Sequence, residues 1–432
     1  MKKSLILGLF PVFLLSFVSK WYVDVGFRIP YYLFLAAPWC ALAVPGISRR
    51  KIMVPAGLQL LIFLKFAYLA AIALSFLSIL DSPDPAASLQ FIKGFAMAGI
   101  DTLIITTILL FIAKLDQPER MYVLRLYLGA VACHMVYMVT EALSIYLFDI
   151  DIDILISERI PFWSQPVVTM AQDQFYLVAL GTIYRLSGFT GDPNIAGVSL
   201  ALIIPVIFYC YALKTRISDF ALALWALLLI ISTVSNTAIP IAGMILLALS
   251  ARYWRRRKLL VTGILVSLAI GALLVIKKQA EALDELAAFK LSIDGTTSTH
   301  LTIAKDAINL WLQHPLGVGL NNFALHSAHV SAHNSYVQTL VELGILGLLT
   351  TLIWVGGCLW LSYRSANTIG TTAILVVAAL AIAANGHDLL FRFEFQLITH
   401  ILVAMAIVER WLDVRSARSS QCGQPFPVGR SV

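Results

Sequence analysis

The sequence predicts an all-α polytopic membrane protein, and three observations carry that prediction. Hydrophobic residues make up 59% of the 432 residues, charged residues only 13%, and the mean hydropathy is +0.85. An ordinary soluble domain carries about 25% charged residues. Apolar stretches of about 20 residues, long enough to cross a hydrocarbon core of about 30 Å, recur along the chain. The composition therefore excludes a soluble globular protein, and we expect one integral membrane domain over residues 1–432.

We predict about twelve transmembrane helices. Their ranges are 4–19, 29–47, 52–79, 90–113, 122–147, 194–212, 219–234, 237–252, 259–276, 334–362, 369–385 and 395–411. The first apolar run imitates a signal peptide, but no small-x-small cleavage site follows it, so we interpret it as a retained span. The connection "STVSNTAIP" is short enough to join the seventh and eighth helices in a tight hairpin.

Lys and Arg predict the orientation, because cytoplasmic loops carry an excess of these residues. With the N-terminus inside, the inner segments include "MKK", "SRRK" and "ARYWRRRK" and hold most of the basic residues. Both termini, including a tail over 412–432, are therefore expected in the cytoplasm. Two long segments, 148–193 and 277–333, then face outward.

Both outer segments contain signs of order. The first holds the aromatic stretch "RIPFWSQP". The second holds apolar residues at helical spacing after a Ser/Thr run suited to capping a helix: Leu301, Ala304, Ile308, Trp311 and Leu312. We interpret these segments as membrane-surface helices that roof an outward-facing cavity. Since no ATP is available on that side, a substrate must arrive already activated.

The stretch "AHNSYVQTLVELGILG" (332–347) opens the tenth helix with a polar pair. A helix N-terminus offers unpaired N–H groups and about half a positive charge. That field disfavours imidazolium, so we expect His333 to stay neutral and to accept a proton. Asn334 is expected to cap the helix or to hold a substrate oxygen, although an ordinary helix start explains the pair equally well. Glu342 lies nine residues after His333, which is about 13 Å along the helix at ~1.5 Å per residue. This is too far for Glu342 to orient the imidazole directly, so we expect it to contact a neighbouring helix.

Arg185 precedes, by seven residues, the Asp192-Pro193 pair that predicts the start of the sixth helix. A guanidinium there suits a diphosphate, because its fork binds two oxygens at once. An arginine that snorkels to lipid headgroups is the alternative. The stretch "HPLGVGLNNF" (314–323) places two glycines two residues apart, which we interpret as a tight turn.

Neither a metal nor a nucleic acid is an expected partner. The five cysteines show no CxxC spacing, and His326 and His329 form an HxxH pair on a loop without a third ligand. No basic stretch is interleaved with aromatic residues in a soluble region.

Charged residues within membrane spans are costly and usually face a bundle interior or a water-filled cavity. The predicted spans contain Lys65, Lys93, Asp101, Glu141 and Glu342. Such residues are compatible with a catalytic cavity or with a transporter. Asp388, Arg392 and Glu394 cluster in the last outer loop, where we expect a local ion pair; the alternative is that they line the same cavity.

Three motifs together resemble the O-antigen ligase family. They are R-x-S-G-x-x-x-x-P-N, which runs from Arg185 to Asn194; "HPLGVGLNNF"; and His-Asn-x9-Gly-x-x-Gly, formed by His333, Asn334, Gly344 and Gly347. The similarity is sharpest over 297–350 and weaker over 184–200. O-antigen and exopolysaccharide polymerases are relatives of this family.

The resemblance implies a GT-C-like, inverting membrane glycosyltransferase that requires neither a metal nor a cofactor. Its donor would be a glycan on undecaprenyl diphosphate, at the periplasmic face of a bacterial inner membrane. The acceptor would be a sugar hydroxyl on lipid A-core for a ligase, or on another lipid-linked glycan for a polymerase. We expect the ligase, with the polymerase as the alternative. A lipid-linked glycan flippase or transporter is the other class to be tested.

The resemblance also implies roles for particular residues. His333 matches the family histidine that activates or positions the acceptor hydroxyl, and Arg185 matches the first arginine, which holds the diphosphate. The further substrate-binding candidates are Asn194, His300, Asn334 and Asp388, of which Asp388 matches a late acidic position.

The chain departs from the family pattern at two places. Ser235-Asn236 stands where a Ser-Arg pair is common, and His300 stands where a second arginine is common. The candidates for the missing positive charge are Lys277, Lys278 and Lys305; the alternative is that the acceptor differs from lipid A-core, as in a polymerase.

Overall fold

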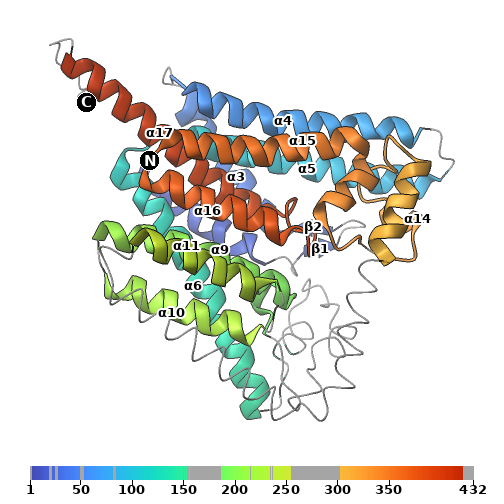
Figure 1. The fold of residues 1–432 in the computed structure, drawn as a ribbon, viewed down its shortest axis with the longest axis horizontal. Helices are drawn as coiled ribbons and strands as arrows, with labels where there is room; N and C mark the ends of the chain where they lie inside the picture. Colours follow the sequence, from blue (N-terminus) through green and yellow to red (C-terminus); the bar gives the residue numbers. More distant parts are fainter. Residues whose placement is uncertain are drawn as a thin grey trace.

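The computed structural model is a bundle of long helices (Figure 1). It describes residues 2–18, 22–24, 28–48, 53–80, 84–148, 186–214, 216–233, 237–253, 302–329 and 331–421, with the single residues 150, 152, 155 and 235.

Every predicted span has a helix in its place, except 259–276, which lies outside the described residues. The helices are α1 (Lys2–Leu7), α2 (Leu9–Ser16), α3 (Tyr31–Ser48), α4 (Ala56–Ser75), α5 (Pro85–Ile112), α6 (Gln117–Phe148), α9 (Pro193–Lys214), α10 (Ile217–Ser232), α11 (Ala238–Tyr253), α14 (Phe323–His326), α15 (Ser335–Ser365), α16 (Thr368–Ala383) and α17 (Phe393–Gln421). A further helix covers residues 302–313, and two single 3-10 turns are η1 (Phe76–Ser78) and η2 (Gly188–Thr190).

The described helices include several that are suited to a membrane. Five are long and apolar enough to cross one: Ala56–Ser78, Pro85–Ile112, Gln117–Phe148, Pro193–Lys214 and Ser335–Ser365. Shorter apolar helices cover Tyr31–Pro45, Ile217–Ser232, Ala238–Ala251 and Thr368–Ala383. The prediction of a helical, polytopic membrane protein is therefore confirmed at this level, whereas twelve full-length spans exceed what the described residues show.

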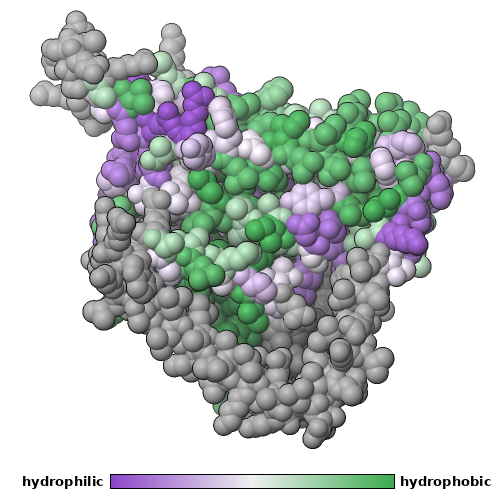
Figure 2. Space-filling model, viewed as in Figure 1, coloured by the Kyte–Doolittle hydropathy of each residue, from purple (hydrophilic) through white to green (hydrophobic). Residues whose placement is uncertain are grey.

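Burial separates the central helix from those at the surface. The most apolar stretch of α9 is 89% buried, whereas the corresponding stretches of α4, α5 and α15 are each 39% buried. Helix α9 packs against α10, α11 and α16, and α15 packs along α4. Figure 2 shows hydrophobic residues over α4 and α15, with hydrophilic residues toward both ends of this band. This distribution is that of a lipid-facing surface.

Local sequence explains where several helices begin. The Asp84 carboxylate accepts a hydrogen bond from the Ala86 N–H (2.8 Å), with Pro85 as the first helical residue of α5. The predicted start at Asp192 is also confirmed, because its Oδ1 accepts from the Asn194 N–H (2.8 Å) and Pro193 begins α9. A capping acid followed by proline supplies an acceptor and removes one unpaired donor.

Three features of the fold were not predicted. Strands β1 (Tyr22–Asp24) and β2 (Arg28–Pro30) form a short antiparallel hairpin beside the helices. Helix α17 continues to Gln421, into the segment predicted as a tail over 412–432. Helix α15 is interrupted at Gly344, which has φ 68° and ψ −168°.

The helix predicted in the second outer segment is present over residues 302–313. Ile303 and Ala307 are buried, together with Val341 of α15, whereas Ile308 and Leu312 are exposed. The helical spacing predicted the helix correctly. It did not predict the packed side, because apolar residues occur on both sides of this helix.

Candidate functional site

Asn334 caps helix α15, as one of its two predicted roles required. Its Oδ1 accepts hydrogen bonds from the N–H groups of Tyr336 (3.0 Å) and Val337 (3.1 Å). Its Nδ2 donates to the carbonyl of Asn385 (3.1 Å), in the loop before α17. The amide is thus engaged at both ends, which fixes the start of α15 and leaves its oxygen committed to the cap.

His333 lies immediately before this cap, with an exposed side chain and a backbone φ of 51°. This left-handed conformation is uncommon for a residue other than glycine. The His333 N–H donates to Ser331 Oγ (3.0 Å). Backbone strain of this kind persists only where the surroundings fix it, and it concentrates at functional sites.

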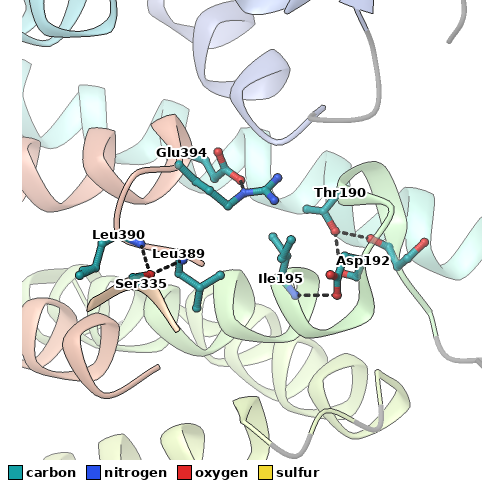
Figure 3. Close-up of polar contacts among 9 residues, drawn as sticks. Thr190, Asp192, Ile195, Ser335, Leu389, Leu390 and Glu394 are labelled. Carbon is teal, nitrogen blue, oxygen red and sulfur yellow. Dashed lines mark hydrogen bonds and ion pairs between the residues drawn. The ribbon is translucent and has the colours of Figure 1, made fainter. Parts of the chain in front are cut away.

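Ser335 joins the start of α15 to residues 384–392, the loop that leads into α17. Its Oγ accepts from the N–H groups of Leu389 (2.8 Å) and Leu390 (3.2 Å), as Figure 3 shows. Its N–H donates to the carbonyl of Ala384 (2.8 Å), and its hydroxyl donates to the carbonyl of His387 (2.9 Å). The buried Ser335 hydroxyl therefore both donates and accepts hydrogen bonds, and these bonds hold the loop close to His333.

The expected local ion pair in this loop is present, and it joins Arg392 Nε to Glu394 Oε1 at 2.7 Å. In the described part of the chain, the two terminal nitrogens of Arg392 have no hydrogen-bond acceptor. Arg392 also lies close enough to Asp192 and Asp388 to interact electrostatically with both. Figure 3 shows the starts of α9, α15 and α17 near one another, at Asp192, Ser335 and Glu394.

Asp388 stands at the same place. Its side chain reaches the surface of the described residues, yet protein atoms crowd the carboxyl group and raise its pKa above the ordinary value. Arg392 and the Ser335 hydroxyl act in the opposite direction and lower the pKa. That hydroxyl has one proton, which it can donate to the His387 carbonyl or to Asp388, but not fully to both.

The R-x-S-G motif is anchored from α6. The Glu141 carboxylate accepts from the Gly188 N–H (2.7 Å), the Ser187 N–H (3.2 Å) and Ser187 Oγ (3.1 Å). The Phe189 N–H donates to Nδ1 of His134 (3.2 Å). Gly188 has φ 55°, and a Cβ there would come within 2.7 Å of Met138. Only glycine fits this turn, which explains the last residue of the motif.

The two glycine motifs meet at the break in α15. Because Gly344 interrupts the helix, the carbonyls of Val341 and Glu342 accept from the N–H groups of Val318 (2.8 Å) and Gly319 (2.9 Å). A Cβ on Gly317 would overlap the Glu342 carbonyl. The segment 314–323 is therefore a turn built for close backbone approach, as its glycines predicted.

Three predicted site residues are brought into one region, namely His333, Asn334 and Asp388. Asn194 lies at the start of α9, where its N–H contributes to the Asp192 cap. Arg185 and His300 lie outside the described residues, as do Asn236, Lys277 and Lys278. Lys305 is exposed on the 302–313 helix.

Sequence reasoning missed four residues that shape this region: Ser335, Gln338, Arg392 and Glu141. Arg392 was expected in a local ion pair or in the lining of the cavity, and Glu141 only as a costly buried charge. For Ser335 and Gln338 the available signal was position, since both lie within the His-Asn-x9-Gly-x-x-Gly motif, whereas Glu141 lies far along the chain from the motif that it holds. Nothing in the sequence showed which loop each residue would hold.

The charged residues inside the spans hold structural elements together. Lys65 donates to Gln396 of α17, and Tyr32 of α3 donates to Asp101 (2.7 Å). The Glu342 carboxylate accepts from Gln338 of its own helix (2.8 Å) and from the N–H of Phe323, the first residue of α14 (3.4 Å). Buried charges of this kind are stable only when their partners are fixed.

The loop histidines do not gather into a metal-binding cluster. His326 faces His314, with ring centroids 5.8 Å apart, and His329 lies 4.0 Å from Asp306. Among the described residues, no group of three or more His, Cys, Asp or Glu side chains is placed to hold a metal ion.

Replacing Asn334 by Ala tests the cap. We expect the free energy of unfolding to fall by about 1 kcal/mol, the usual cost of losing an N-cap, with a further loss from the Asn385 contact. Asn334→Asp keeps the capping oxygen and should restore most of the difference. Thermal unfolding in detergent measures both variants. Equal midpoints for Asn334→Ala and the unaltered protein would contradict the structural role of this cap.

Comparison with known protein families gives a match in the second half of the chain. A protein-family model described as O-antigen ligase matches residues 220–352. The matched segment includes most of α10, all of α11, the 302–313 helix, the glycine turn, His333 and the break at Gly344. A comparison with curated proteins gave no match.

Proposed function

We propose that this chain is a member of the O-antigen ligase family and transfers a glycan from undecaprenyl diphosphate to a sugar hydroxyl of lipid A-core; the match of the family model to residues 220–352 supports this proposal. In this proposal it is a GT-C-like glycosyltransferase of the bacterial inner membrane, and the reaction takes place at the periplasmic face. The observation that carries the proposal is His333, exposed in a strained conformation between a helix cap and a turn that are both fixed by hydrogen bonds.

The chemistry requires a group that accepts the proton of the acceptor hydroxyl. As that oxygen forms a bond to the anomeric carbon, the bond from this carbon to the diphosphate oxygen breaks, and the proton passes to His333. A single displacement inverts the anomeric configuration. The adjacent N-terminus of α15 favours the neutral imidazole, the form able to accept a proton. The diphosphate leaves as an anion, so the step needs no metal to create a leaving group.

A cation is needed where negative charge develops on the leaving diphosphate. Arg185 takes this role in the proposal. Asp388, beside the start of α15, is assigned to a sugar hydroxyl, because a carboxylate accepts hydrogen bonds from such groups. Asn194 and His300 are further contacts in the same proposal.

A flippase or transporter is the competing class of protein. The hydrogen bonds of the charged residues within the spans help to distinguish it from an enzyme. Lys65, Asp101, Glu141 and Glu342 hydrogen bond to a neighbouring helix, to a turn or to their own helix. This use of the charges supports an enzyme whose loops are fixed on a rigid bundle, rather than a carrier whose charges bind the cargo.

Surface glycan from a host that lacks the gene tests the proposal. A gel should show bare lipid A-core, with full-length glycan remaining on the polyprenyl carrier. Lipid A-core bearing a single repeat, with the long chains lost, would instead identify a polymerase. Glycan retained on the inner face of the membrane would identify a flippase.

The pH dependence of kcat/KM should depend on the interaction between Arg392 and Asp388. Arg392 lowers the pKa of Asp388, so Arg392→Gln should raise that pKa further. If the carboxylate binds substrate, the acid limb of kcat/KM then moves to higher pH, since more of Asp388 is protonated at a given pH. Arg392→Lys keeps a positive charge and should shift the limb less. An acid limb that is unchanged in Arg392→Gln would exclude Asp388 as the titrating group.

A further inference from the structure

Gln338 and Glu342 form a buried hydrogen-bonded pair one turn apart on α15. Gln338 Nε2 donates to Glu342 Oε1 (2.8 Å), and Gln338 Oε1 accepts from the N–H of Ala332 (2.7 Å). Ala332 is the residue before His333. The pair therefore connects the interior of α15 with the backbone that carries the imidazole.

The chemistry of the two side chains fixes their orientation. A carboxylate only accepts hydrogen bonds, whereas an amide has one accepting and one donating end. Glu342 must face the NH₂ group of Gln338, which directs the amide oxygen toward Ala332. Without the carboxylate, the amide could turn over and present two donors to the Ala332 N–H.

Glu342 is itself held by the glycine turn. Its Oε1 accepts from the Phe323 N–H (3.4 Å), and its carbonyl accepts from the Gly319 N–H (2.9 Å). A continuous set of hydrogen bonds thus runs from the turn at 314–323, through Glu342 and Gln338, to residue 332. The next residue but one, Asn334, is fixed separately by its own cap.

We propose that Gln338 and Glu342 are positioning residues, which hold His333 in its left-handed conformation and so direct its imidazole at the acceptor. The proposal rests on the proposed function, in which His333 accepts the proton. His333 is held on both sides, by the Ala332 bond before it and by the Asn334 cap after it. Loss of the first contact frees the backbone to leave a conformation that is unfavourable for histidine.

Single substitutions provide the first test, with reconstituted protein and a polyprenyl-diphosphate-linked glycan as donor. Gln338→Leu should lower kcat about tenfold, as expected for a lost hydrogen bond worth roughly 1.4 kcal/mol, with little change in the donor KM. Gln338→Glu should be worse, because two carboxylates then face each other. Ser362→Ala is the matched control. It removes another buried hydrogen bond of α15, to the Cys358 carbonyl, and should retain full activity.

Exchanging the pair provides the sharper test. In Gln338→Glu/Glu342→Gln, the carboxylate at 338 accepts from Ala332 and from the amide at 342, whose oxygen can still accept from Phe323. The exchange should recover most of the kcat lost in Gln338→Glu, which a merely space-filling role would not produce. A double variant no more active than Gln338→Glu, at equal amounts of folded protein, would overturn the proposal.

The His333→Ala background separates this proposal from the proposed function. If Gln338 acts through His333, adding Gln338→Leu to His333→Ala should cause no further loss of residual activity. A fully active His333→Ala protein would refute the catalytic role of His333 and this proposal with it. An inactive His333→Ala protein beside a fully active Gln338→Leu protein would refute the positioning role alone.

Discussion

Replacing His333 by Ala should lower glycan transfer by about 100- to 10,000-fold, the range that a general base contributes. The loss should fall on kcat, because the proposed role of the exposed His333 side chain is to accept the proton during the chemical step rather than to bind the donor. Transfer by purified protein in liposomes, from a lipid-linked donor to lipid A-core, measures the effect directly.

Two controls keep this result specific. His329→Ala removes a histidine from the same loop and should leave transfer nearly unchanged. His333→Asn keeps a residue that tolerates a left-handed backbone but cannot act as a base at neutral pH, so it should be as inactive as His333→Ala. An active His333→Asn protein would mean that backbone geometry, rather than proton transfer, is what position 333 supplies.

Replacing Gly344 by Ala should have the largest effect on stability. Its φ of 68° with ψ of −168° belongs to a region that only glycine populates, and strain there costs of order 1–3 kcal/mol. An added Cβ would also lie 2.6 Å from the Leu316 carbonyl carbon and 2.7 Å from the Pro315 oxygen. The glycine turn would then be displaced from the break, and we expect a lower unfolding temperature together with lost transfer.

Gly356 offers a matched control on the same helix. A Cβ there meets nothing within 4 Å, so Gly356→Ala should leave stability unchanged or raise it slightly, since alanine favours helices by about 1 kcal/mol over glycine. Thermal unfolding of both variants in one detergent gives the comparison. Equal stability of Gly344→Ala and Gly356→Ala would contradict a built-in break.

The local features of the site were predictable from the sequence. The Asn334 cap, the Asp192-Pro193 start and the long spans depend on neighbouring residues or on hydrophobic length alone. For this reason, every predicted span in the described chain has its helix, within a few residues at most ends. The final helix is the main exception, because the charged residues after 408 resemble a tail as much as a helix that leaves the membrane.

The break at Gly344 was not predictable, because the apolar character of α15 continues on both sides of it. The structural role of the break is to let the turn at 314–323 pack against α15. This packing is a tertiary contact, which the local sequence does not show. The same holds for Glu141 and Glu342. The sequence shows an expensive buried carboxylate, but the N–H groups that stabilise each one come from segments remote in the chain.

The most direct test of the central claim is a reconstituted transfer reaction. Purified protein is placed in liposomes with a glycan on undecaprenyl diphosphate and with lipid A-core, and the products are separated on a gel. We predict that the glycan moves to lipid A-core, that free polyprenyl diphosphate accumulates, and that His333→Ala stops both. Glycan that remains on its carrier with the unaltered, folded protein, or that moves only to another lipid-linked glycan, would contradict the assignment as a ligase.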